Sequence, residues 1–380
     1  MAGKVFCKEK IKEAYQGISF KKPQADTMKI SIIGAGNGGQ AMAGHFALLG
    51  HQVCLYNRTP ENLKEIATQQ RILLNEAIKG VGYLQKVTSD LKEAVENAEL
   101  IMITTTADAH REIAEKIAPL VTDGQLIVLN PGRTMGAFEF GTILRKITNK
   151  KVFVAEAQSL IYACRAEIPG QVRVIGVKDK VMLAAYPHND TNYVLKVVNS
   201  VFPCFVEARN VLETSLENIG AILHPSVILF NAATIERGQG FYFYNDMTPA
   251  IASFLEQIDG ERLLIGDAFG IKLKSVSDWV SYAYAGISGQ NLCDKIKNNP
   301  AYYKILAPNR LQSRLLLEDI PTGILPMIEL GSLAKVKTPL MESVLNISQA
   351  LLSIDFRQKG RTLKNLGIEQ ITMNKFVEHL

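Results

Sequence analysis

The sequence contains little cysteine and no long uninterrupted apolar run. Its 5 cysteines are scattered over 380 residues, and none of them forms a C-x-x-C pair. This excludes a disulfide framework and indicates reduced thiols. The longest apolar segment, residues 219–235, is interrupted by a histidine, a proline and an asparagine, which favours a buried helix over a membrane span. The first residues also lack the apolar stretch of a secretory signal. We therefore expect a cytoplasmic protein with no membrane segment and no bound metal.

The charge balance is also modest. The formal charge is +5, from 42 Lys and Arg against 37 Asp and Glu. Lysines crowd the first 22 residues, but aromatic side chains are not interleaved with them as in nucleic-acid-binding modules. We interpret residues 1–27 as a solvated N-terminal arm and expect no nucleic-acid partner.

A glycine-rich turn near the start of the chain carries the strongest functional information. Residues 28–33 form a short β-branched strand, residues 40–49 have the composition of a helix that ends before Gly50, and a second strand follows at 52–56. Between the first strand and the helix lies a G-x-G-x-x-G motif. A Cβ at its middle glycine would hold the backbone away from a pyrophosphate, and the helix N-terminus offers free N–H groups to the phosphates. The predicted dinucleotide-binding loop is therefore Gly34, Ala35, Gly36, Asn37, Gly38 and Gly39.

The end of the second strand bears on the choice of cofactor. An NAD-preferring site usually places Asp or Glu here, where it accepts a hydrogen bond from the ribose 2′-hydroxyl. This chain has a neutral Asn57, followed by Arg58, whose guanidinium suits a 2′-phosphate. We therefore predict that NADP(H) is preferred and that Asn57, Arg58 and Thr59 lie at the ribose. If Arg58 points to solvent instead, NAD(H) is the cofactor. Thr105, directly after a strand at 100–104, completes the expected cofactor site.

The pattern of strands and helices predicts two domains. Strands alternate with helices as far as residue 155, which indicates a doubly wound parallel sheet of the Rossmann type. Two runs at 172–177 and 181–186 predict a hairpin at one edge of this sheet. Beyond residue 208 the apolar residues follow helical spacing. We expect a dinucleotide-binding domain at 28–207 and an all-α catalytic domain at 208–380.

A histidine in the second domain is the first catalytic candidate. His224 is followed directly by Pro225 inside a helical pattern, so the helix should kink there and could turn the imidazole toward the cleft between the domains. A satisfied core histidine is an equally good interpretation of this feature alone. His110, which follows the fourth strand, is the rival candidate.

The second candidate is the segment from Arg314 to Pro321. Arg314 and Glu318 are four residues apart, which predicts a surface ion pair on one helix face. Asp319 precedes Ile-Pro, where a helix should end, and its carboxylate could orient a histidine and raise its pKa. The sequence does not show whether Asp319 meets His224.

These residues together resemble the opine dehydrogenases of the octopine/nopaline dehydrogenase family. The resemblance covers about residues 28–367 and rests on segments 33–39, 108–112, 123–133, 155–165, 224–231, 241–249 and 318–321, which include Asn-Pro-Gly-Arg, His-Pro and Glu-Asp-Ile-Pro. It implies an NAD(P)-dependent oxidoreductase that joins an amino acid to a 2-keto acid such as pyruvate, giving a secondary amine. It further implies that His224 and Asp319 form the catalytic dyad and that Arg314 grips a substrate carboxylate. The resemblance does not name the amino acid.

Two alternatives remain open at this point. The first is a reductase of a keto acid, hydroxy acid or sugar phosphate with the same architecture; such enzymes typically use a lysine of the second domain, and Lys272 and Lys274 lie in a helical region without a recognisable motif. The second is a non-enzymatic NADP-binding protein. A homodimer through the helical domain is a further expectation.

Overall fold

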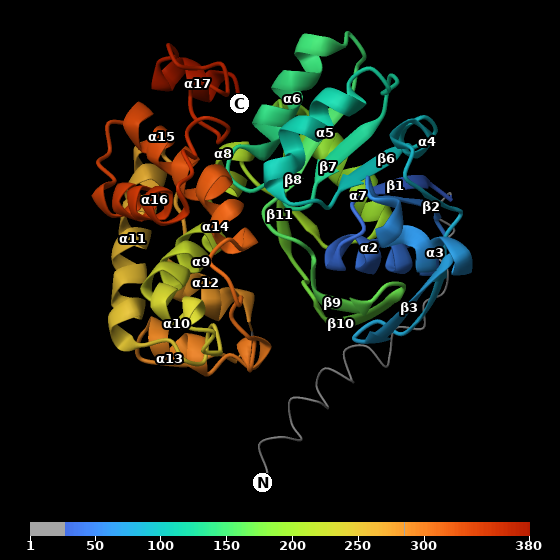
Figure 1. Cartoon of the computed structure of the whole chain (residues 1–380). Coiled ribbons are helices and arrows are strands. Elements are labelled where there is room, and N and C mark those ends of the chain that lie inside the picture. Colours follow the sequence, from blue (N-terminus) through green and yellow to red (C-terminus); the bar gives the residue numbers. More distant parts are fainter. Residues whose placement is uncertain (1–26, 285) are drawn as a thin grey trace.

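The computed structural model describes residues 27–284 and 286–380. Figure 1 shows a lobe of strands and helices from the first half of the chain beside a lobe of helices from the second half. Almost all of the expected N-terminal arm, residues 1–26, lies outside the described residues. The expected class, a doubly wound sheet followed by an all-α domain, is confirmed.

The main sheet has eight strands in the order β12-β11-β8-β7-β6-β1-β2-β5. The strands from β8 to β5 in this order are parallel, whereas β11 is antiparallel to β8. The central strands β6 and β7 are buried along their whole length, as expected for a parallel sheet covered on both faces. The bounds are β1 Lys29–Ile33, β2 Gln52–Tyr56, β5 Lys86–Thr88, β6 Leu100–Ile103, β7 Leu126–Leu129, β8 Phe153–Ala157, β11 Val181–Ala185 and β12 Phe205–Glu207.

Helices cover both faces of this sheet and form two cores. Alternate residues of each strand point to opposite faces: Ile32 belongs to the core with α2 and α7, and Ile33 belongs to the core with α4, α5 and α6. The second of these cores continues without a break into the helical domain. The helices are α2 Asn37–Leu48, α3 Lys64–Gln69, α4 Leu91–Val95, α5 His110–Ile117, α6 Gly136–Ile147 and α7 Thr191–Val201.

The expected hairpin between residues 172 and 186 is wrong. Strand β10 (Gln171–Val177) belongs to a separate four-stranded sheet, β4-β3-β10-β9, whereas β11 joins the main sheet. This second sheet contains β3 (Arg71–Glu76), β4 (Gly80–Tyr83) and β9 (Tyr162–Ile168), and it contacts α2. Strand alternation identifies a strand but does not select its partner, so the short link at 178–180 was interpreted as a turn within one sheet.

One helical expectation also needs correction. The apolar segment 219–235, expected as a single buried helix, consists of α9 (Ile219–Phe230) and α10 (Ala232–Glu236), and a short helix α8 (Val211–Leu216) precedes them. Before α3, Pro60–Leu63 form a 3₁₀ turn. Helix α9 continues past Pro225 for more than one turn.

The second half of the described chain is helical. Helix α9 packs against α11 (Pro249–Ala268), α14 (Arg314–Leu317) and α16 (Pro339–Leu352). The other helices are α12 (Val276–Ala283), α13 (Leu292–Lys297), α15 (Leu325–Leu333) and α17 (Met373–Glu378), and a π-helical turn at Ile320–Ile324 joins α14 to α15. Among the described residues, no helix is both long and apolar enough to cross a membrane. Strand β12 ends at the residue where we place the domain boundary, and that division remains our proposal.

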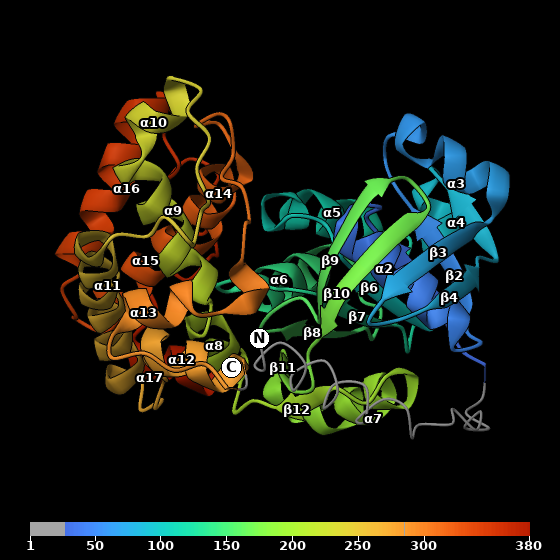
Figure 2. The same cartoon turned by 90° about the horizontal axis from the view of Figure 1, so that it is seen from below.

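The end of the chain returns to the first domain. The buried guanidinium of Arg361 donates to the carbonyl oxygens of Gly132 and Thr134, at 3.0 and 2.7 Å. In α17, Phe376 packs edge-on against Phe138 of α6. Figures 1 and 2 both show the C-terminus on the side of the helical lobe that faces the strands. These contacts hold the loop 130–134 at the junction of the two lobes.

Candidate active site

The glycine loop has the geometry that a bound pyrophosphate requires. Gly34 has a φ of +115°, which disfavours other residues. A Cβ at Gly39 would lie 1.7 Å from the carbonyl oxygen of Gly34, so this glycine allows α2 to pack on the turn. A Cβ at Gly36 would meet nothing within 4 Å. Gly36 therefore faces open space, and its hydrogen side chain is not needed for packing of the protein itself.

The N-terminus of α2 completes this loop. Gly36 is the N-cap, and no side chain caps the first N–H groups of the helix, which leaves them available to phosphate oxygens. The side chains of the turn are turned toward the protein: Asn37 Oδ1 accepts from the backbone N–H of Ala166 at 3.0 Å, and Ala35 is buried. Leu160 packs on Gly38, where a Cβ would come within 2.8 Å of it. The loop thus fits a dinucleotide.

The expected ribose end of the site lies at the surface. Arg58 is 72% exposed, and its guanidinium is 3.5 Å from Glu112. Asn57 Oδ1 accepts from the backbone N–H of Thr59 at 2.9 Å, which fixes the turn after β2. Thr105 lies against Gly34, and its hydroxyl group is buried without a hydrogen-bond partner.

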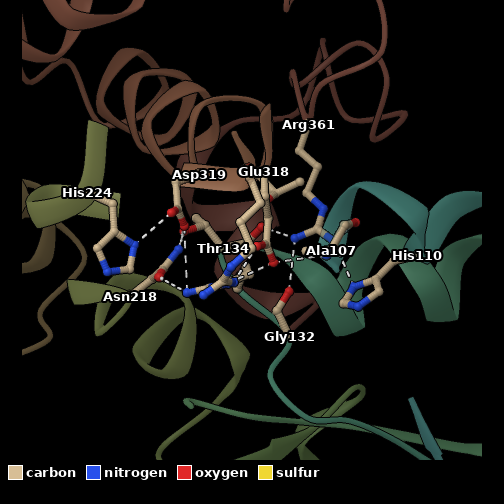
Figure 3. Close-up of polar contacts among 12 residues, drawn as sticks. Ala107, His110, Gly132, Thr134, Asn218, His224, Glu318, Asp319 and Arg361 are labelled. Atoms are coloured by element: carbon tan, nitrogen blue, oxygen red, sulfur yellow. Dashed lines mark hydrogen bonds and ion pairs between the residues drawn. The ribbon is translucent and has the colours of Figure 1, made fainter. Parts of the chain in front are cut away.

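His224 and Asp319 come together at the junction of the domains. His224 lies on α9, and Asp319 lies between α14 and the π-helical turn. Nδ1 of His224 is 2.8 Å from Oδ2 of Asp319, and Figure 3 shows the two side chains pointing toward each other. Nε2 of His224 lies 3.5 Å from the hydroxyl of Tyr244. A Cβ at Gly220, one turn earlier on α9, would approach the imidazole to 3.1 Å, so glycine makes room for the ring.

Charge around Asp319 keeps this carboxylate ionised. Asp319 is fully buried, and burial alone would raise its pKa, but the charges of Arg133 and His224 outweigh burial and lower the pKa from its usual value. Nη1 of Arg133 is 3.7 Å from Oδ1 of Asp319. An ionised Asp319 can only accept a hydrogen bond, so this contact orients the ring with a proton on Nδ1.

Arg133 is a site residue that the sequence analysis did not single out. Its Nε lies 3.3 Å from Oε1 of Glu318, and its Nη1 lies 3.3 Å from the side-chain oxygen of Asn218. Glu318 also accepts from the backbone N–H of Ala107 in the first domain, at 3.1 Å. Arg133 adopts a left-handed backbone with a φ of +62°. The Asn-Pro-Gly-Arg segment could have indicated Arg133 as a site residue, because it forms a turn after a parallel strand and such turns lie at the edge of the sheet where ligands bind.

Two other expected residues take different places. Nη1 of Arg314 binds Oε2 of Glu318 at 3.0 Å, and the side chain of Arg314 is 59% exposed. It lines a separate hollow with Arg310 and Asp108. His110 is fully buried, and Figure 3 shows it facing the guanidinium of Arg361, 3.1 Å from Nδ1. Burial and the charge of Arg361 lower the pKa of His110 well below its usual value. His110 is therefore a neutral core residue.

A cavity of about 170 Å³ lies in front of His224. Its lining includes residues from both domains, so a ligand in it would contact both. Aromatic side chains form one part of the cavity wall: Tyr244, Trp279, Tyr284 and Tyr302. Polar or charged side chains form the other part: Arg133, Gln158, Ser159, Lys178, Glu217 and Asn218. Tyr244 and Tyr302 stack at 4.0 Å between ring centres. A cavity lined in part by aromatic side chains, with a few polar groups directed into it, is typical of a small-molecule binding site.

The fold and this site define a two-lobed dehydrogenase with a dinucleotide-binding loop and a His–Asp pair at a cavity that both lobes line. Residues 207–352 match the family described as NAD/NADP octopine/nopaline dehydrogenase, alpha-helical domain, and residues 29–132 match the N-terminus of NAD-dependent glycerol-3-phosphate dehydrogenase. An opine dehydrogenase of Arthrobacter sp. (strain 1C) is 38% identical over 344 residues, which cover 90% of this chain and 96% of that protein.

Solved structures agree on the fold. An octopine dehydrogenase bound to NADH and L-arginine superposes with a TM-score of 0.78 at 21% identity, covering 92% of this chain and 98% of that one. A yersinopine dehydrogenase with NADP⁺ bound gives a TM-score of 0.69 at 15% identity, covering 93% and 97%.

The chain belongs to the opine dehydrogenase family. It is an NAD(P)-dependent oxidoreductase of the kind that acts on the CH–NH group of donors.

Proposed function

We propose that this protein condenses the amine of an amino acid with a 2-keto acid such as pyruvate and reduces the imine to a secondary amine dicarboxylate. The single observation that carries the proposal is the 2.8 Å contact between His224 and a buried, ionised Asp319 at a cavity lined by both domains. The family of the chain supports the same reaction. A second proposal follows for the residues: His224 and Asp319 are the catalytic pair, and Arg314 binds a substrate carboxylate.

The chemistry follows from the position of the imidazole. Protonated His224 donates its Nε2 proton to the keto oxygen while the neutral amine attacks the carbonyl carbon. The now neutral His224 takes up the proton that the new ammonium group releases, and it passes this proton to the hydroxyl group, which leaves the carbinolamine as water. Asp319 holds the ring through Nδ1 and places a negative charge beside it while the ring is protonated. The glycine loop would hold the pyrophosphate of a reduced nicotinamide dinucleotide, whose chemistry would be to supply the hydride for the imine carbon. In the reverse direction, neutral His224 activates the water that attacks the imine.

We further propose that the cofactor contacts residues 34–39, 57–59 and Thr105 and that NADP(H) is preferred over NAD(H). The absence of a carboxylate at the end of β2 supports this preference, and the guanidinium of Arg58 is accessible to a 2′-phosphate. Glu112 would compete with a phosphate for Arg58. An exposed ion pair of this kind contributes little free energy, so Arg58 would readily exchange Glu112 for a phosphate. A cytoplasmic location and a homodimer stay predictions from the sequence.

The decisive experiment measures NADPH and NADH oxidation with pyruvate, with and without a pool of amino acids. We expect oxidation that depends on the amine in the wild type and falls by about 10²–10⁴-fold in His224→Ala, with cofactor binding unchanged. His379→Ala, which alters an exposed histidine near the end of the chain, is the matched control. Oxidation that ignores the amines would favour a simple keto-acid reductase. Cofactor binding without turnover for any keto acid, and no effect of His224→Ala, would favour a binding protein.

A further inference from the structure

Lys178 is a second cationic group in the cavity, contributed by the first domain. It follows β10 directly, in the link that leads to the main sheet. Its Nζ lies 2.9 Å from the hydroxyl of Ser159, and both residues line the cavity in front of His224. The side chain is partly buried, so its ammonium faces the cavity wall more than bulk solvent.

The two cations of the cavity differ in their partners. The charge of Arg133 is balanced by Glu318 and Asp319, at 3.3 and 3.7 Å. Within residues 27–284 and 286–380, Lys178 forms no ion pair with a carboxylate, and Ser159 is its one side-chain hydrogen-bond partner. Burial, and then the nearby charge of Arg133, lower the pKa of Lys178 to about 8. A desolvated ammonium beside a like charge is unfavourable by itself and is stabilised when an anion binds.

The proposed reaction supplies anions of the right kind. An opine-type product has a carboxylate on each side of its secondary amine, so a site that holds both carboxylates needs two separated cationic groups. Arg314 would serve one carboxylate from the neighbouring hollow, which Glu318 connects to the cavity because the carboxylate of Glu318 contacts both Arg314 and Arg133. We propose that Lys178 binds the carboxylate of the other substrate, from the wall of the cavity formed by the first domain; this inference rests on the proposed function.

The cofactor is a second source of an oxyanion. Leu160 packs on Gly38 of the glycine loop, and its neighbour Ser159 is the hydrogen-bond partner of Lys178. Lys178 therefore lies close to the glycine loop as well as in the wall of the cavity. A cofactor phosphate would also suit an unpaired ammonium. The position of His224 in the same cavity favours the substrate carboxylate. The carboxylate of the keto acid is bonded to the carbonyl carbon that reacts, and that of the amino acid is bonded to the carbon that carries the reacting nitrogen.

A labelling experiment separates these sources without turnover. The intact protein is acetylated with limiting acetic anhydride, and the modification of Lys178 is measured by mass spectrometry. The protein is tested alone, with NADP⁺, and with NADP⁺ and either pyruvate or an amino acid pool. We expect protection of Lys178 relative to Lys180 only when a carboxylate substrate is present. The labelling of Lys180, exposed two residues later, corrects for the acetic anhydride that the amines of the amino acid pool consume. Protection by NADP⁺ alone would assign Lys178 to the cofactor, and equal labelling throughout would overturn the proposal.

Kinetics provide the second, independent test. In Lys178→Gln we expect the KM of one carboxylate substrate to rise roughly 10- to 100-fold, as for a lost charged hydrogen bond. The KM of NADPH should not change, Lys178→Arg should recover most of the affinity, and Lys180→Gln should behave as wild type. Unchanged KM values for both carboxylate substrates in Lys178→Gln would overturn the proposal. Amine-independent oxidation by the wild type would instead contradict the proposed function. The protection of Lys178 by pyruvate would still show whether this lysine binds a carboxylate substrate.

Discussion

Nδ1 of His224 lies 2.8 Å from Oδ2 of Asp319, although the two residues are 95 positions apart in the chain. Helix α9 carries the histidine, and the turn after α14 carries the aspartate. Arg133, from the first domain, approaches the other carboxylate oxygen. The pair is therefore held from three separate segments, and its geometry depends on how the domains meet.

The first prediction concerns the charge of Asp319. Asp319→Asn keeps the shape of the side chain but removes the anion that favours the imidazolium. We expect kcat for imine formation and reduction to fall roughly 10²–10⁴-fold, with NADPH affinity unchanged. Steady-state kinetics and cofactor fluorescence measure both quantities. Asp123→Asn, a change at an exposed carboxylate, serves as control, and a kcat within twofold of wild type in Asp319→Asn would contradict the assigned role.

The second prediction separates two glycines of the same loop. In Gly39→Ala the Cβ meets the carbonyl oxygen of Gly34 at 1.7 Å, so the turn must open. We expect a loss of about 2–4 kcal/mol in the free energy of unfolding, in the range of severe packing changes. In Gly36→Ala the Cβ meets nothing within 4 Å. This variant should unfold at nearly the wild-type temperature but bind NADPH at least about tenfold more weakly, because the methyl group occupies the place of the pyrophosphate.

Thermal unfolding and equilibrium titration with NADPH check this pair. Similar stability loss in both variants would show that the glycines act only on folding. Normal NADPH binding by Gly36→Ala would contradict the placement of the cofactor on the loop.

The third prediction concerns cofactor preference. Arg58→Ala should raise the KM of NADPH by about 10-fold, which corresponds to one exposed charge-assisted contact with phosphate, and leave that of NADH nearly unchanged. Glu112→Gln frees Arg58 from its 3.5 Å ion pair and should lower the KM of NADPH slightly. Initial rates with each cofactor measure the effect. Equal changes for NADPH and NADH in Arg58→Ala would remove the basis for an NADP(H) preference.

The fourth prediction is a pH dependence of substrate affinity. Burial and the charge of Arg133 lower the pKa of Lys178 to about 8, so the lysine carries a charge below that pH and loses it above. The KM of the carboxylate substrate should therefore rise at alkaline pH, by about tenfold per pH unit beyond the midpoint. The other ionisable groups that line the cavity are Arg133, Glu217, His224, Tyr244, Tyr284 and Tyr302. The arginine in Lys178→Arg keeps its charge at alkaline pH, so this variant should not show the rise in KM. If Lys178→Arg has the same pH profile of KM as the wild type, the titration belongs to another of these groups.

The sequence by itself determined the class of the fold and the nature of the loop. The run of glycines from Gly34 to Gly39 lies between a β-branched strand and a helix, and local backbone sterics allow few other uses for it. Helical and strand periods are local as well, which is why the change from an α/β half to a helical half could be predicted. The candidates His224 and Asp319 also came from local features, a proline within a helix and a helix end.

Only the tertiary structure decided which of these residues meet. The sequence placed the runs before and after residues 178–180 in one hairpin, whereas the structure assigns them to two sheets, because pairing depends on which surface each strand covers. His110 was a plausible rival until burial against Arg361 made it a core residue. Lys178 had no local mark as a site residue, and the only local indication for Arg133 was its place in the Asn-Pro-Gly-Arg turn. The two residues share a cavity with His224 because loops at one edge of a sheet converge, and convergence is a property of the folded chain.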